Sequence, residues 1–153
     1  MVAPDRVDQR SRRGWSDDMP NSAQGAVQLW MPATASYMLL ARLGVGAIGG
    51  ILDCSVDEID DLRLAVEELC LWAMRQPRDR RGTLRVSLRW DDQTLEATCD
   101  LEPDDVAMTE PAEVDELTDG LSRQILAALV DEHGMVTEDG RVHGWLRKKR
   151  LAT

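Results

Sequence analysis

Apolar residues recur with two different periods along this chain, and the changes of period mark the expected secondary structure. Alternation of apolar and polar residues predicts strands, and the pairs Asp91-Asp92 and Asp139-Gly140 are turn signals between them. Steps of three and four residues predict helices. The predicted strands are 27–31, 83–89, 94–99, 135–137 and 141–147, and the predicted helices are 36–51, 55–77 and 121–132.

The second predicted helix carries the clearest signals. Ser55 and Glu58 have the spacing of a capping box, in which each side chain pairs with an otherwise unpaired backbone N–H group. One stripe of the helix is apolar and is expected to face the core, and Pro77 ends the helix. The apolar stripe is formed by Ile59, Leu62, Val66, Leu69 and Ala73, and a neighbouring stripe by Asp61, Ala65, Glu68 and Trp72. The second stripe is where we look for functional residues.

The third predicted helix is expected to hold His133 in its last turn and to end at Gly134 as its C-cap. The order of elements is then β-α-α-β-β-α-β-β. Paired strands between helices favour an α+β two-layer sandwich, with a mixed sheet and three helices on one face. Residues 1–26 lack hydrophobic periodicity and are interpreted as a flexible tail, so the predicted domain spans residues 27–150.

Composition restricts the function of this domain. The 153 residues carry 18 basic and 28 acidic side chains, and the net charge of −10 argues against nucleic acid and anionic membranes as direct partners. No apolar run reaches the length of a membrane span, and the first residues contain no stretch that could act as a secretory signal. The three cysteines have no close spacing, which predicts neither a disulfide framework nor a zinc site. We therefore expect a cytoplasmic protein with reduced thiols, among them Cys70 as a core thiol.

Three segments resemble a known family. LARLGVGAIGG, SVDEIDDLRLAVEELC and LSRQILAALVDE are similar to the anti-sigma factor kinases of the RsbW and SpoIIAB type, particularly the actinobacterial members. The similarity covers about residues 27–150, and DLRLAVEE is its most specific part. That family belongs to the GHKL ATPase superfamily. The resemblance therefore implies the Bergerat fold, which is also the fold of histidine-kinase-like ATPases.

The resemblance also assigns candidate nucleotide-site residues. In the family, a Glu on the second helix orients the reacting hydroxyl or water, and an Asn four residues later holds Mg²⁺ against ATP. Glu68 keeps the first position, but the second is Trp72, which has no oxygen for a hard cation. Asp100 corresponds to the Asp that reads adenine, without its following glycines, and Gly120 is the last trace of the glycine-rich lid. The alternative is a solvated carboxylate at Glu68 and a packing residue at Trp72.

Charge argues against nucleotide binding independently of the resemblance. Residues 102–119 carry eight carboxylates, and no glycine occurs between Gly82 and Gly120. Phosphate cradles use backbone N–H groups, often those of glycine, together with positive potential. Two unit charges about 4 Å apart interact by roughly 4 kcal/mol at a dielectric of 20, so these acids would oppose a triphosphate. We therefore expect a pseudokinase without a cofactor, and ATP with Mg²⁺ only if the site functions.

The resemblance implies a partner surface as well. In the family, an Arg that follows an Ala early in the first helix touches the sigma factor and the anti-anti-sigma protein, and Ala41-Arg42 matches it. Glu113 and Glu116 are candidates for contact with a basic sigma factor surface. The expected function is an anti-sigma regulator that sequesters an alternative sigma factor. The alternatives are an active serine kinase acting on a STAS-type anti-anti-sigma factor, with Glu68 as the catalytic carboxylate, or control of an unrelated protein. A homodimer is compatible with the glycine-rich first helix.

Overall fold

The computed structural model describes residues 24–76, 82–103, 116–138 and 140–149. Within these ranges, strands and α-helices follow in the predicted order, with a short 3-10 turn η1 (Ala35–Tyr37) before the first α-helix. The elements are β1 (Gly25–Pro32), α1 (Met38–Ile51), α2 (Val56–Arg75), β2 (Gly82–Trp90), β3 (Thr94–Pro103), α3 (Glu116–Leu129), β4 (Glu132–Glu138) and β5 (Arg141–Lys149). Among the described residues, no helix combines the length and the apolar character needed to cross a bilayer.

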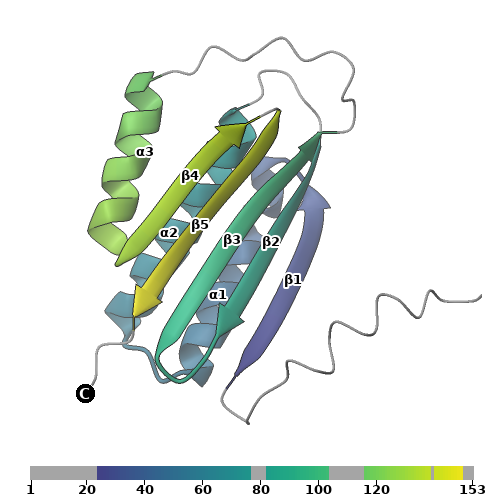
Figure 1. Cartoon of the computed structure of the whole chain (residues 1–153). Helices are drawn as coiled ribbons and strands as arrows, with labels where there is room; N and C mark the ends of the chain where they lie inside the picture. The colour runs from purple at the N-terminus through teal and green to yellow at the C-terminus, as the bar shows by residue number, and fades with distance from the viewer. Residues whose placement is uncertain (1–23, 77–81, 104–115, 139, 150–153) are drawn as a thin grey trace, which may run out of the picture.

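The strands form one sheet in the order β1-β2-β3-β5-β4, and each neighbouring pair is antiparallel (Figure 1). The prediction of a mixed sheet is therefore wrong for the described strands. The path of the chain explains why every neighbouring pair is antiparallel. Two helices between β1 and β2 return the chain to the end of the sheet where β1 stops. The crossover through α3 makes β4 parallel to β3, but β5 lies between these two strands and pairs with both. The α+β two-layer class with its three helices is confirmed.

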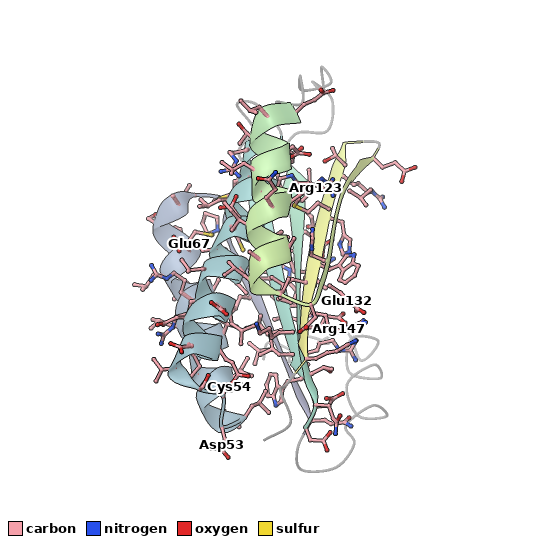
Figure 2. The ribbon with its side chains drawn as sticks, turned by 90° about the vertical axis from the view of Figure 1, so that its left-hand side faces the viewer. Asp53, Cys54, Glu67, Arg123, Glu132 and Arg147 are labelled. Atoms are coloured by element: carbon pink, nitrogen blue, oxygen red, sulfur yellow. The ribbon has the colours of Figure 1, made fainter. Side chains whose placement is uncertain are left out.

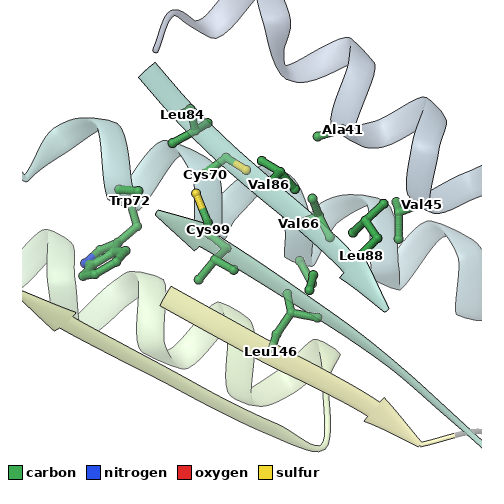
Figure 3. Close-up of a cluster of buried hydrophobic side chains, with 14 of the residues drawn as sticks. Ala41, Val45, Val66, Cys70, Trp72, Leu84, Val86, Leu88, Cys99 and Leu146 are labelled. Atoms are coloured by element: carbon green, nitrogen blue, oxygen red, sulfur yellow. The ribbon is translucent and has the colours of Figure 1, made fainter. Parts of the chain in front are cut away.

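Alternate residues of the strands point into a core between the sheet and the helices (Figure 3). The strands contribute Leu84, Val86 and Leu88 from β2, Leu95, Ala97, Cys99 and Leu101 from β3, and Val142 and Leu146 from β5. The predicted apolar stripe of α2 supplies the facing layer, because Leu62, Val66, Leu69 and Ala73 are buried. Burial of a side chain such as Leu contributes about 1.5–3 kcal/mol, so this layer accounts for much of the force that holds α2 on the sheet.

Two cysteines meet in this core. Cys70 of α2 and Cys99 of β3 are fully buried, and Figure 3 labels both among the side chains between helix and sheet. The hydrogen bond between the two thiols, together with burial, raises the pKa of Cys99 well above its ordinary value. The prediction that Cys70 is a core thiol is confirmed by its burial.

Local signals determine where α2 begins. The Ser55 hydroxyl accepts a hydrogen bond from the Glu58 backbone N–H at 3.2 Å. In return, the Glu58 carboxylate accepts one from the Ser55 backbone N–H at 2.7 Å. The predicted capping box is therefore confirmed.

The prediction for the last helix is wrong at both ends. α3 begins before Leu121 and stops at Leu129, and His133 and Gly134 lie in β4. A Cβ atom at Gly134 would lie 2.4 Å from Nε1 of Trp145, its partner on β5. The glycine is therefore explained by the ring that covers it from the next strand, and not by a helix cap.

Gly144 of β5 lies under α2, where a Cβ atom would meet Leu69 Cδ1 at 2.6 Å and Trp72 Cζ3 at 3.2 Å. Gly144→Ala is expected to lower the free energy of unfolding by about 1–3 kcal/mol, because the methyl group overpacks this contact. Gly120→Ala in α3 is the matched control. Its Cβ atom meets nothing within 4 Å, and alanine inside a helix is expected to add about 0.5–1 kcal/mol. Urea unfolding measures both variants, and equal stability of the two would contradict the close approach of β5 to α2.

Candidate functional site

Glu68, the candidate catalytic carboxylate, lies on the side of α2 that faces α3. Its Oε1 atom accepts a hydrogen bond from the Ser122 hydroxyl at 2.6 Å and another from the Arg75 guanidinium at 3.1 Å. The same Arg75 nitrogen donates to Ser122 Oγ at 2.8 Å, so the three side chains form a closed polar triangle. Ser122 is buried, and 17% of the Glu68 side chain is exposed. Glu68 is therefore a partly buried carboxylate bound to two donors.

Trp72 lies one turn further along α2 and is buried. Its indole N–H donates to Asp119 Oδ1 at 2.5 Å, and Gln76 Nε2 donates to the same oxygen at 3.2 Å. Trp72 is thus a packing residue whose polar end also contacts α3. We call the set that joins the two helices the α2–α3 clamp; it consists of Glu68, Trp72, Arg75, Asp119 and Ser122.

Asp100 lies on the other face of the sheet. Its neighbours Cys99 and Leu101 point into the core, so alternation places the Asp100 side chain on the face that no described helix covers. β3 continues beyond Asp100, which is therefore inside a strand and not in a turn after one. The structure does not bring Asp100 and Glu68 together.

On that outer face, Asp100 takes part in cross-strand polar contacts. Its Oδ1 atom is 2.6 Å from Nδ1 of His143 on β5, and its Oδ2 atom is 3.5 Å from Nη2 of Arg85 on β2. Arg147 on β5 similarly pairs with Glu96 on β3 at 2.9 Å. Such pairs between neighbouring strands contribute to sheet stability, which gives Asp100 a structural role in this fold.

Gly120 and Glu116 both lie in α3, which follows a segment outside the described residues. Gly120 is inside the helix, where neither crowding nor an unusual backbone angle requires a glycine. Glu116 begins the helix and is exposed, whereas Glu113 lies outside the described residues.

Arg42 belongs to α1, on the opposite flank of α2 from α3 (Figure 1). The structure therefore does not join Arg42 and Glu116 into one contact site.

Arg42 lies on an exposed part of α1 and pairs with α2. Its side chain is 46% exposed, and its Nε atom is 3.7 Å from Glu67 Oε2. Leu39 and Leu43, close to it on the same helix, are 58% and 56% exposed. Sequence reasoning identified Arg42 but not these leucines. The signal was present, because α1 has one charged residue, so a single buried face cannot take all of its apolar side chains.

The described side chains at the candidate positions do not fit a Mg²⁺–nucleotide site. The polar group of Trp72 is an indole N–H, which donates a hydrogen bond to Asp119. Trp72 therefore offers no oxygen ligand to Mg²⁺. Oε1 of Glu68 accepts hydrogen bonds from Arg75 and Ser122. These contacts lie between α2 and α3, and α3 is the helix that faces the viewer in Figure 2. Within the described ranges, no three His, Cys, Asp or Glu side chains are grouped so as to hold a metal ion.

Arg75, Asp119 and Ser122 are the members of the clamp that sequence reasoning missed. The spacing of Ser122 from the buried Leu126 is one helical turn, which places its hydroxyl on the inward side of α3. A polar residue at an inward position signals a buried partner, since such groups are hydrogen-bonded in folded proteins. The pattern gives no indication of which partner it is.

The sheet order and the helices on one side define a two-layer α/β sandwich that is consistent with the GHKL-like fold. No family model matches this sequence. The chain is similar to the anti-sigma-F factor RsbW from two strains of Mycobacterium tuberculosis, with 38% identity over 82 residues in each comparison. The match covers 53% of this chain and 49% of each relative, so the chain spans about half the length of the curated relatives it matches. The resemblance to RsbW-type anti-sigma factors is confirmed to that extent.

Glu68→Gln is expected to lower the free energy of unfolding by about 1 kcal/mol, because two charge-assisted hydrogen bonds inside the clamp become weaker. Asp60→Asn on the same helix is the matched control, since its ion pair with Arg63 is exposed and its loss is expected to cost about 0.5 kcal/mol or less. Chemical denaturation at neutral pH compares the two variants. A Glu68→Gln protein as stable as the Asp60→Asn protein would contradict a structural role for Glu68.

Proposed function

We propose that this protein is a cytoplasmic anti-sigma regulator that binds and sequesters an alternative sigma factor without requiring ATP. The similarity to anti-sigma-F factors supports the class of partner. The observation that carries the proposal is the position of Arg42, a half-exposed cation beside exposed leucines on α1. Arginine within an apolar surface is typical of the residues that dominate binding energy in protein interfaces.

Charge supports the same class of partner. The protein has a net charge of −10, and the exposed Glu116 at the start of α3 adds to the negative potential beside α2. Sigma factors present basic DNA-binding surfaces, so an acidic protein is suited to approach and mask them. Independence from ATP is supported by the clamp, which engages Glu68 and Trp72, and by the position of Asp100 on the opposite face.

Arg42→Glu is expected to weaken binding to a purified sigma-F-type sigma factor about 10- to 100-fold, the loss typical of a central interface arginine. Arg89→Glu is the matched control, because Arg89 is exposed on the sheet face that the described helices leave open. Isothermal titration calorimetry measures both affinities. Binding that is unchanged in Arg42→Glu, or weakened equally in both variants, would refute contact through α1.

The alternative function is an active serine kinase, which is favoured by the presence of Glu68. Our proposal predicts no transfer of labelled phosphate from Mg-ATP to a purified STAS-type anti-anti-sigma factor. Phosphoserine formation that is abolished by Glu68→Gln would establish the kinase and overturn the proposal.

A further inference from the structure

The two halves of α3 are held by different forces. In the second half, Leu126 is fully buried against the core. In the first half, Leu117 and Leu121 are 85% and 56% exposed, so little apolar surface fastens this half to α2. Hydrogen bonds of the α2–α3 clamp join this half to α2.

The clamp contacts lie in register along the two helices. Asp119 and Ser122 are three residues apart on α3, and Glu68 and Trp72 are four residues apart on α2, so each pair lies on one side of its helix. Trp72 bonds to Asp119 and Glu68 bonds to Ser122, so the contacts run in antiparallel order. Both contacts therefore form or break with the same movement of the first two turns of α3.

We propose that these two turns, residues 116–122, are a latch that closes the face of α2 carrying Glu68 and Trp72 and opens as a local unit while the rest of the fold stays intact. Opening breaks the hydrogen bonds of the clamp and uncovers part of Trp72, but it adds little apolar surface from the latch itself, because Leu117 and Leu121 are already exposed. Gly120 lowers the helical propensity of the same segment, which favours its opening before the second half of α3.

When the latch is closed, side chains of α3 bind the polar groups of Glu68 and Trp72 on α2, where a ligand would otherwise bind. Its Asp119 carboxylate takes the indole N–H of Trp72, and its Ser122 hydroxyl binds Glu68. An external anion would have to displace a carboxylate that is already bound there, and like charge opposes its approach. This inference concerns the isolated chain and does not depend on the proposed sigma factor partner.

Hydrogen–deuterium exchange of the isolated chain tests the latch. In Ser122→Ala, the amides of residues 117–122 are expected to exchange at least tenfold faster, while those of 124–129 and of β3 change little. Gln124→Ala, on the exposed side of α3, is the control and is expected to leave residues 117–122 unchanged. Equal acceleration throughout the chain, or no acceleration in Ser122→Ala, would overturn the proposal.

The wild-type protein gives a second readout that does not rely on a variant. At low urea concentrations, exchange of residues 117–122 is expected to accelerate with urea much less than exchange in β3, because local opening exposes far less surface than global unfolding does. Saturating Mg-ATP is expected to leave the latch exchange unchanged. Urea dependence equal to that of β3, or slower exchange with Mg-ATP, would overturn the latch as an independent, internally occupied unit.

Discussion

The close approach of α2 to β5 at Gly144 is the constraint on which the other contacts of the helical layer depend. Because Gly144 has no side chain, Leu69 and Trp72 lie directly over the strand. Trp72 is thereby buried with its ring fixed between α2 and the sheet, and its N–H group points to Asp119 of α3. A change of one methyl group at this strand position would thus be felt at the helix–helix contact.

α2 fastens both of its neighbouring helices through adjacent carboxylates. Glu67 pairs with Arg42 of α1, and Glu68 accepts hydrogen bonds from Arg75 and from Ser122 of α3. Consecutive residues differ by about 100° around a helix axis, so the two carboxylates are directed to different flanks. The ion pair of Arg42 and the clamp therefore lie on different flanks of the same helix.

The fold was largely predictable because its signals are local: alternation for the strands, a three-to-four period for the helices and a capping box for the start of α2. Pairing over long sequence separation was not predictable, as for Trp72 and Asp119, which are 47 residues apart. The position of the Asp100 side chain, in contrast, could have been predicted. The apolar positions Cys99 and Leu101 on either side of it already indicated an outward side chain, and the resemblance to a nucleotide-binding motif directed attention elsewhere. The antiparallel sheet likewise required knowledge that β5 lies between β3 and β4.

We propose that this domain binds a sigma factor in a form closed by its own α3 and not by ATP. The most direct measurement is the Kd for a purified sigma-F-type sigma factor, determined by titration calorimetry with and without saturating Mg-ATP. We expect the same Kd, within about twofold, in both conditions, since a ligand that binds neither state shifts no equilibrium. Binding that appears only with Mg-ATP, or that Mg-ATP strengthens by tenfold or more, would contradict it.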